Sequence, residues 1–142
     1  MEKKKILVVD DDRMGGIMLQ EFLEREGYEA AAVESGELAL AEFKKSPCDL
    51  ALVDLMMPGM NGMELLVELK ALKPDLPVII LTAHNEIGSY IKAKELGAFE
   101  YVVKPVDFIV LQQMLFSIFA SVDTYHEKPP SRYSKDPLVK RA

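Results

Sequence analysis

The sequence predicts an α/β fold, in which a doubly wound sheet of five parallel strands, in the order 2-1-3-4-5, carries five helices. Short apolar runs, typical of buried strands, alternate five times along the chain with segments of helical spacing. Alternating strands and helices form a parallel sheet covered on both faces, because right-handed crossovers carry each helix over the sheet. The length of 142 residues and the 49% hydrophobic content fit one domain with a substantial core.

Five apolar runs are the expected strands, and most of them end on a polar residue. The central run, Leu50–Val53, ends at Asp54 and is followed by the turn residues Pro58-Gly59 and Asn61-Gly62. A run this short and apolar fits a strand that is buried on both faces of a parallel sheet. The five expected strands are Lys5–Val9, Tyr28–Val33, Leu50–Val53, Val78–Leu81 and Tyr101–Val103.

The expected helices show apolar residues three or four positions apart, flanked by residues that favour helix ends. The first, Met14–Glu26, contains Gly15-Gly16, which costs up to about 1 kcal/mol per Gly relative to Ala. Gly27 ends this helix, and Ser35 is the expected N-cap of the second helix. The second helix buries Leu38, Ala39, Leu40 and Phe43, and the others are Met63–Leu72, Asn85–Glu95 and a last helix from Asp107 to about Tyr125.

Charge and composition argue against several classes of function. The net charge is −6, and residues 126–142 carry +3, so the rest of the chain carries −9 and is not expected to bind nucleic acid directly. No apolar run approaches membrane-spanning length, and Met-Glu-Lys-Lys-Lys leads into a strand rather than a signal peptide. The only cysteine, Cys48, cannot form an internal disulfide, which fits a cytoplasmic location. We therefore expect a domain over residues 1–125, followed by a linker or disordered tail over 126–142.

Polar residues follow the carboxyl ends of four expected strands. Asp10 and Asp11 follow the first, Asp54 the third, Thr82 the fourth and Lys104 the fifth. In open α/β sheets, ligands bind at this edge. Each residue alone also has a structural explanation, as a turn aspartate, a helix N-cap or a surface charge. These explanations do not account for the placement of all these residues at four strand ends. This joint placement favours a functional site.

The residue types at this edge indicate phosphoryl transfer. Two carboxylates 4 Å apart repel by about 4 kcal/mol at an effective dielectric constant near 20, so the cluster predicts a bound cation. Carboxylate and carbonyl oxygens suit Mg²⁺. The cation, Lys104 and the Thr82 hydroxyl would each neutralise one phosphoryl oxygen, and Asp54 would be the nucleophile that forms an acyl phosphate.

Four segments of the chain resemble the receiver domain of bacterial two-component response regulators. They are Val-Val-Asp-Asp, Asp-Leu-Met-Met-Pro-Gly-Met-Asn-Gly, Leu-Thr-Ala-His and Gly-Ala-Phe-Glu-Tyr-Val-Val-Lys-Pro, and the resemblance runs from about Lys4 to Tyr125. It implies a flavodoxin-like, CheY-like fold and a signalling switch rather than an enzyme. It also implies that a sensor histidine kinase donates the phosphoryl group to Asp54.

The resemblance also implies a role for individual residues. Mg²⁺ would be held directly by Asp11, Asp54 and the Met56 carbonyl, and through water by Asp10. Thr82 and Tyr101 would form a switch pair that acts on the face made by the fourth helix, fifth strand and fifth helix. The Lys104–Pro105 peptide would be cis, and the side chains of Met56 and His84 would flank the water that hydrolyses the acyl phosphate.

Several alternatives can be weighed against the residues. A flavin-binding domain of this fold needs a Gly- and hydroxyl-rich phosphate loop where this chain has aspartates, and an aspartate-nucleophile phosphatase typically has a second Asp where this chain has Met56. A degenerate receiver that only binds partners would lack Asp54, Thr82 or Lys104. The chain is then either a stand-alone receiver or the N-terminal part of a transcription activator whose output domain lies beyond Ala142.

The last helix has more apolar residues than a single buried stripe requires. Phe108, Leu111, Leu115, Ile118, Phe119 and Val122 suffice for such a stripe. Ile109, Val110, Met114 and Phe116 remain, and they indicate either a homodimer interface or a wider buried stripe.

Overall fold

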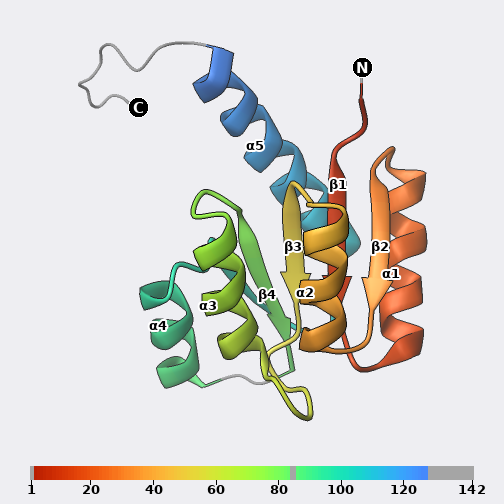
Figure 1. The fold of residues 1–142 in the computed structure, drawn as a ribbon. Coiled ribbons are helices and arrows are strands. Elements are labelled where there is room, and N and C mark those ends of the chain that lie inside the picture. Colours follow the sequence, from red (N-terminus) through yellow and green to blue (C-terminus); the bar gives the residue numbers. More distant parts are fainter. Residues whose placement is uncertain (1, 84–85, 128–142) are drawn as a thin grey trace. The chain divides into compact units, whose positions relative to one another are not determined.

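The computed structural model describes residues 2–83 and 86–127, and it confirms the predicted sheet of five parallel strands in the order β2-β1-β3-β4-β5 (Figure 1). The strands are β1 (Lys5–Val9), β2 (Glu29–Val33), β3 (Leu50–Val53), β4 (Val78–Thr82) and β5 (Glu100–Val103). The helices are α1 (Arg13–Arg25), α2 (Gly36–Lys45), α3 (Gly62–Leu72), α4 (Ile87–Glu95) and α5 (Phe108–Glu127).

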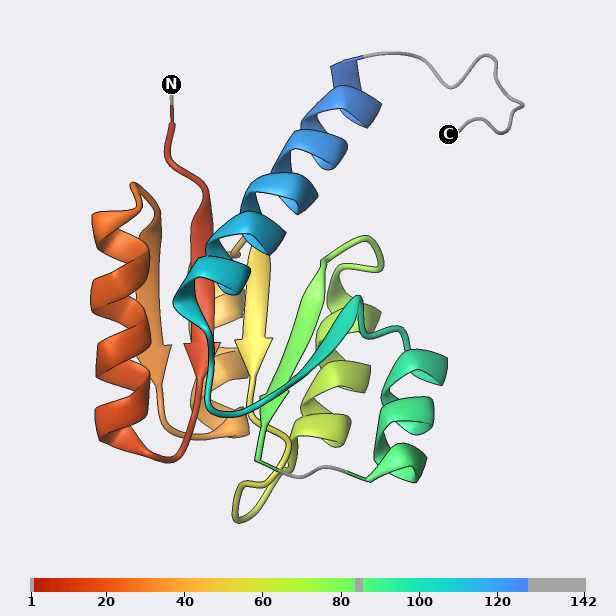
Figure 2. The same cartoon turned by 180° about the vertical axis from the view of Figure 1, so that it is seen from behind.

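The first of two compact units runs to Val106 and contains the whole sheet together with α1 to α4. Helix α1 covers one face of the sheet and α2 and α3 cover the other, while α4 contacts β5 (Figures 1 and 2). The strands are parallel. Val9 of β1 is paired with Val53 of β3, and Thr82 of β4 is paired with Val103 of β5. The residues that follow these positions are therefore brought to one edge of the sheet.

Strands β1, β3 and β4 form the centre of the core. Every residue of these three strands is buried, which explains why their sequences are continuous apolar runs rather than alternating patterns. Leu65, Leu66 and Leu69 of α3 are fully buried. Edge strands differ, since β2 and β5 contain mostly half-exposed residues. The acidic end of the sheet is therefore built on its most buried part.

Element boundaries differ from the predicted ones by a few residues, for local reasons. Tyr28 precedes β2 rather than starting it, because its N–H closes α1 by donating to the Leu23 carbonyl oxygen (3.0 Å) after Gly27, whose φ is 97°. Helix α3 begins one residue earlier than predicted, since Asn61 and Glu64 form a reciprocal capping box. Helix α4 begins at Ile87, and the predicted start at Asn85 lies outside the described residues.

The second unit begins at Asp107 and contains α5. The Asp107 carboxylate accepts hydrogen bonds from the N–H groups of Ile109 (2.9 Å) and Val110 (3.3 Å), as an N-cap does. The helix extends to Glu127, two residues past the predicted end, so the first residues of the expected linker are helical. The rest of that expected segment, 128–142, lies outside the described residues. Leu111, Leu115, Ile118 and Phe119 are buried, while Ile109, Val110 and Phe116 are exposed.

Two further observations bear on the predicted environment of the chain. None of the helices in the described ranges combines the length and apolar character needed to span a lipid bilayer. Cys48 is a free, buried cysteine, and burial raises the pKa of its thiol to about 11. Its side chain is therefore an inert thiol at neutral pH, as expected of a small core residue.

Candidate functional site

The backbone of the sheet holds the site residues one position beyond the strand ends. The Asp54 N–H donates to the Val9 carbonyl oxygen (2.9 Å), and the Lys104 N–H donates to the Thr82 carbonyl oxygen (2.8 Å). The Asp10 N–H likewise donates to the carbonyl oxygen of Val33 (3.1 Å). The hydrogen-bond ladder thus continues through Asp10, Asp54 and Lys104, so the pairing of the strands determines where these residues lie.

Three carboxylates converge at this edge. Asp10 and Asp54 are almost fully buried, with exposed fractions of 3% and 9%, whereas Asp11 is exposed. One oxygen from each of the three lies within 4.8 Å of the others. A compact set of carboxylate oxygens is the donor set that hard divalent cations such as Mg²⁺ prefer, so these residues fit the predicted metal.

Lys104 lies between two of the three carboxylates. Its Nζ donates to Asp10 Oδ2 (2.7 Å) and contacts Asp54 Oδ2 (3.4 Å). Burial alone would lower the pKa of Lys104, but the hydrogen bond and negative charge of Asp10, together with those of Asp54, raise it above its ordinary value. Lys104 is therefore a cation whose side chain links the carboxylates that follow β1 and β3.

The surroundings of Asp54 act on the pKa of its carboxyl group in two opposite directions. Burial raises the pKa of Asp54, and the charge of Asp10 adds to this, while Lys104 and the Met56 N–H act in the opposite direction. The Met56 N–H donates to Asp54 Oδ1 (3.2 Å). Each oxygen of Asp54 thus has a donor that favours the ionised form, the form able to act as a nucleophile.

The loop after Asp54 is held against it by a glycine that the sequence reasoning treated only as a turn residue. The Gly62 N–H donates to the Leu55 carbonyl oxygen (2.9 Å). A Cβ at residue 62 would overlap the Asp54 carbonyl oxygen and lie 2.7 Å from the Leu55 Cα. Only glycine permits this approach of two backbones. The available signal was the Asn61-Gly62 pair ahead of Glu64, which marks both a helix cap and a tight loop.

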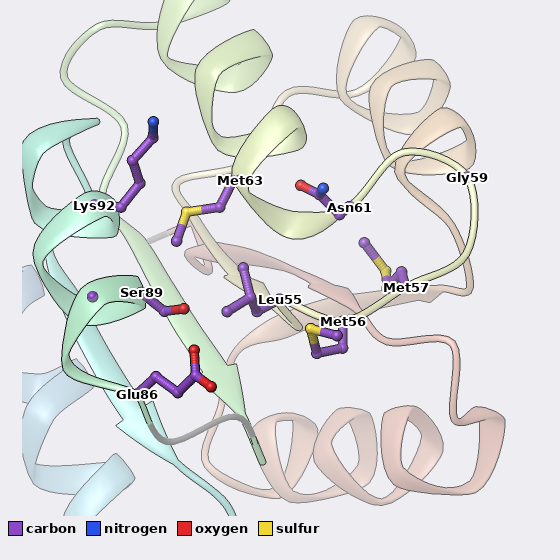
Figure 3. Close-up of a pocket in the computed structure, with 10 residues that line it drawn as sticks. Leu55, Met56, Met57, Gly59, Asn61, Met63, Glu86, Ser89 and Lys92 are labelled. Carbon is purple, nitrogen blue, oxygen red and sulfur yellow. The ribbon is translucent and has the colours of Figure 1, made fainter.

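A cleft of about 510 Å³ opens beside the loop that follows Asp54. Figure 3 shows Ser89 and Lys92 of α4 on one side of it and Leu55, Met56 and Met63 on the other. The Met56 side chain is 58% exposed, so it is available to flank whatever approaches this loop from solvent.

The two predicted switch residues lie on neighbouring strands. Thr82 is fully buried at the end of β4, and Tyr101 on β5 is half-buried. The Tyr101 ring packs edge-on against Tyr90 of α4, with ring centroids 5.7 Å apart. Burial raises the pKa of the Tyr101 hydroxyl. The peptide bond between Lys104 and Pro105 is cis. His84, predicted to flank the hydrolytic water, lies outside the described residues.

Comparison with known proteins identifies the family. The model of the response regulator receiver domain matches residues 6–116. The chain is 38% identical over 126 residues to the transcriptional regulatory protein ZraR of Escherichia coli K12, covering 89% of the chain and 29% of ZraR. It is 39% identical over 107 residues to sporulation initiation phosphotransferase F of Bacillus subtilis, covering 75% of the chain and 86% of that protein.

Solved structures agree with the sequence comparison. The response regulator TrrA of Thermotoga maritima, in complex with Mg²⁺ and BeF, has a TM-score of 0.74 and 38% identity, covering 81% of this chain and 98% of that one. A receiver domain protein of Clostridium thermocellum has a TM-score of 0.80 and 32% identity, covering 85% and 98%. The chain thus matches almost the whole of these structures, whereas it spans less than a third of ZraR.

Proposed function

The chain belongs to the response regulator receiver domains of two-component signalling, and on that basis we propose that Asp54 accepts a phosphoryl group from a sensor histidine kinase. The observation that carries the proposal is the convergence of Asp10, Asp11 and Asp54 within 4.8 Å, with the Lys104 ammonium in contact with two of them. Asp54 is the member of this cluster that follows β3, at the middle of the edge.

The proposed transfer moves one phosphoryl group between two side chains. A carboxylate oxygen of Asp54 forms a bond to phosphorus as the phosphorus–nitrogen bond of the donor phosphohistidine breaks, and the electron pair leaves with the imidazole nitrogen. Lys104 stays protonated and moves from Asp54 toward the incoming phosphoryl oxygen. Thr82, buried at the end of β4, places its hydroxyl near a second oxygen.

A divalent cation completes the proposed site. Asp11, Asp54 and the Met56 carbonyl would hold it directly and Asp10 through water, and when bound it would neutralise charge that develops on the phosphoryl oxygens. The support for Mg²⁺ is the all-oxygen donor set. The burial of Asp10 and Asp54 adds to this support, because buried like charges need compensation beyond that of a single lysine.

Phosphate labelling tests the acceptor. We expect the full chain, incubated with Mg²⁺ and acetyl phosphate, to gain the mass of one phosphoryl group, and Asp54→Ala or chelation of the metal to abolish the gain. Asp75→Ala is the matched control, because Asp75 is exposed and precedes β4 at the opposite edge of the sheet. Labelling of Asp54→Ala at the wild-type rate would show that another residue is the acceptor.

We further propose that Thr82 and Tyr101 relay the phosphorylation state to the α4 and β5 surface. Movement of Thr82 toward the phosphoryl group leaves space into which the half-buried Tyr101 ring turns, and this removes its edge-on contact with Tyr90. In Thr82→Ala, we expect the NMR signals of Tyr101 to lose their response to phosphorylation or to beryllofluoride. The conservative variant Thr82→Ser should retain the response, and a full response in Thr82→Ala contradicts the relay.

We propose homodimerisation as one use of the exposed apolar residues. In the first unit Ile87, Ile91 and Phe99 are exposed, and on α5 Ile109, Val110 and Phe116 are exposed. Sedimentation with and without beryllofluoride tests this, with Phe116→Glu expected to weaken the dimer and Gln113→Glu, a change at an exposed polar position of the same helix, expected to leave it intact. A chain that stays monomeric in both states has no such dimer.

The output of the switch is proposed in two forms. The likeness to ZraR favours the N-terminal part of a transcription activator, and the likeness to sporulation initiation phosphotransferase F, nearly all of which the chain covers, favours a stand-alone phosphate shuttle. The length of the encoding gene distinguishes them, because an activator needs an output domain beyond Ala142. Because the chain carries a net negative charge, we expect no binding of nucleic acid through this domain in either form.

A further inference from the structure

Methionines are concentrated in the loop that follows Asp54 and in the first turn of α3. Four of the eight methionines of the chain lie there, namely Met56, Met57, Met60 and Met63. Met57 is buried, and the side chains of Met60 and Met63 pack against the hydrophobic core. Met56 differs from the other three because it is 58% exposed. This segment therefore presents one thioether to solvent, close in the chain to the proposed phosphoryl acceptor.

The backbone of Met56 holds its side chain near Asp54. The Met56 N–H donates to Asp54 Oδ1 (3.2 Å), and the Met56 side chain lines the cleft of Figure 3, across from Ser89 of α4. Leu55 and Met57, its neighbours in the chain, are both buried, so the loop is anchored in the core on either side of Met56. The exposed thioether thus extends from a backbone that is hydrogen-bonded to the Asp54 carboxylate.

Peroxides oxidise the sulfur atoms of cysteine and methionine, and burial decides which of these atoms they reach. Cys48 is buried and the pKa of its thiol is raised to about 11, so it lacks the thiolate form that reacts. Among the methionines in the described part of the chain, Met14, Met18 and Met56 are exposed. Met14 and Met18 belong to α1, and of these three only Met56 belongs to the loop that follows Asp54.

We propose that Met56 is a reversible oxidation site, through which hydrogen peroxide shortens the lifetime of the acyl phosphate. The thioether sulfur attacks one oxygen of the peroxide, the oxygen–oxygen bond breaks, and the sulfur loses two electrons as it becomes a sulfoxide. The other oxygen leaves as hydroxide and becomes water by taking the proton of the transferred OH group. The inference rests on the proposed function of Asp54 and adds a chemical signal that acts on the same site.

Oxidation changes the property that keeps Met56 from orienting a water molecule. A thioether is apolar and a weak hydrogen-bond acceptor, whereas a sulfoxide is polar and carries an oxygen that accepts hydrogen bonds. A water bound to this oxygen would lie beside the phosphorylated Asp54, because the Met56 backbone already contacts that carboxylate. The change is the same in kind as Met56→Asn, in which an acceptor replaces an apolar group. Hydrolysis of the acyl phosphate should therefore become faster.

The test measures the loss of label from Asp54 in the full chain, with and without prior oxidation. Peroxide is removed, the protein is loaded with Mg²⁺ and acetyl phosphate, and the decay is followed after the donor is withdrawn. Peptide mass spectrometry should find the sulfoxide at Met56 before it appears at the buried Met57. We expect the oxidised wild type to lose its label severalfold faster, and treatment with methionine sulfoxide reductases to restore the slower decay.

Two leucine variants identify the methionine that is responsible. Each variant is compared with itself before and after peroxide, so an effect of the substitution on the unoxidised rate does not enter the comparison. Met56→Leu should show no acceleration, and Met18→Leu, which removes an exposed methionine of α1, should accelerate as the wild type does. Acceleration that persists in Met56→Leu, or unchanged decay in a wild type that carries the Met56 sulfoxide, overturns this inference and leaves the proposed function standing. A wild-type chain that takes no label at Asp54 overturns the proposed function and this inference with it.

Discussion

At the carboxyl edge of the sheet, the side formed by β1 and β3, the acidic side, is much more buried than the side formed by α4 and β5. On the acidic side, every residue of β1 and β3 is buried, and Asp10 and Asp54 extend their backbone ladders. On the other side, α4 has one buried residue, Ala93, and β5 has none. Ile87 at the start of α4 is 78% exposed.

This difference in burial fits the proposed division between an acidic site that accepts the phosphoryl group and a surface that reports it. Asp10 and Asp54 follow β1 and β3, two strands that cannot shift without disturbing the core. Elements with few buried contacts have low local stability and are the ones that a ligand can displace. Strand β5 pairs with β4 beside Thr82 and carries Tyr101, whose ring contacts Tyr90 of α4. Under the proposed relay, a small change at Thr82 would therefore reposition β5 and α4 at little cost.

The largest expected contrast between the two sides is in stability. Leu52→Ala in β3 removes a fully buried side chain and should lower the free energy of unfolding by about 2–5 kcal/mol. Ile87→Ala in α4 removes an exposed one and should change it by about 0.5 kcal/mol or less. Urea unfolding measures both. Similar losses at the two positions would mean that α4 is not the looser side.

The glycines of the two sides should also respond in opposite directions. Gly62→Ala forces the backbone at residue 62 away from the backbone of Asp54 and Leu55 and should destabilise the protein by about 1–3 kcal/mol. Gly88→Ala in α4 meets nothing within 4 Å and should stabilise it by up to about 1 kcal/mol through helix propensity. The same unfolding experiment tests this pair, and a Gly62→Ala protein as stable as wild type would show that the loop adapts easily.

A smaller effect is expected on the lifetime of the acyl phosphate. Met56 is apolar, offers no proton acceptor and is exposed beside the cleft of Figure 3, so it cannot orient a hydrolytic water. We expect Met56→Asn to speed the loss of label from Asp54 severalfold, with Met18→Asn, an exposed methionine of α1, as the control. The predicted partner position His84 is tested by His84→Glu. Unchanged or slower decay in Met56→Asn would show that its side chain does not control the water.

The smallest expected effect is a pH dependence without metal. Burial raises the pKa of Asp54, so above the ordinary carboxyl value of 3.8 the folded state holds a proton that the unfolded state has lost. The stability that Asp54 contributes through this more tightly held proton is present at low pH and is lost as the pH rises through the pKa of Asp54 in the folded state. In a chelator, Asp54→Asn should therefore gain stability over wild type as the pH rises above the ordinary carboxyl value of 3.8, measured as an increase in Tm, while Asp75→Asn should not.

The residues of the site could be predicted from the sequence where each signal lies within a short segment of the chain. Apolar runs followed by Asp10, Asp54 and Thr82 determine buried strands, and parallel strands must end at one edge, so the convergence followed from the pattern alone. Helix α3 begins at Gly62, one residue before the predicted start, although the Asn61 and Glu64 pair that forms its cap is visible in the sequence. The predicted second strand begins at Tyr28, but the Tyr28 N–H closes α1 and β2 begins at Glu29.

By itself, the sequence determined the class of fold, the strand order and the identity of the residues at the carboxyl edge of the sheet, because side-chain periodicity and chain direction are local properties. Only the tertiary structure decided that Lys104 is closer to Asp10 than to Asp54 and that Gly62 lets the loop lie against the Asp54 backbone. These distances join residues up to 94 positions apart in the chain. They depend on how whole elements pack, and no short segment of sequence contains that information.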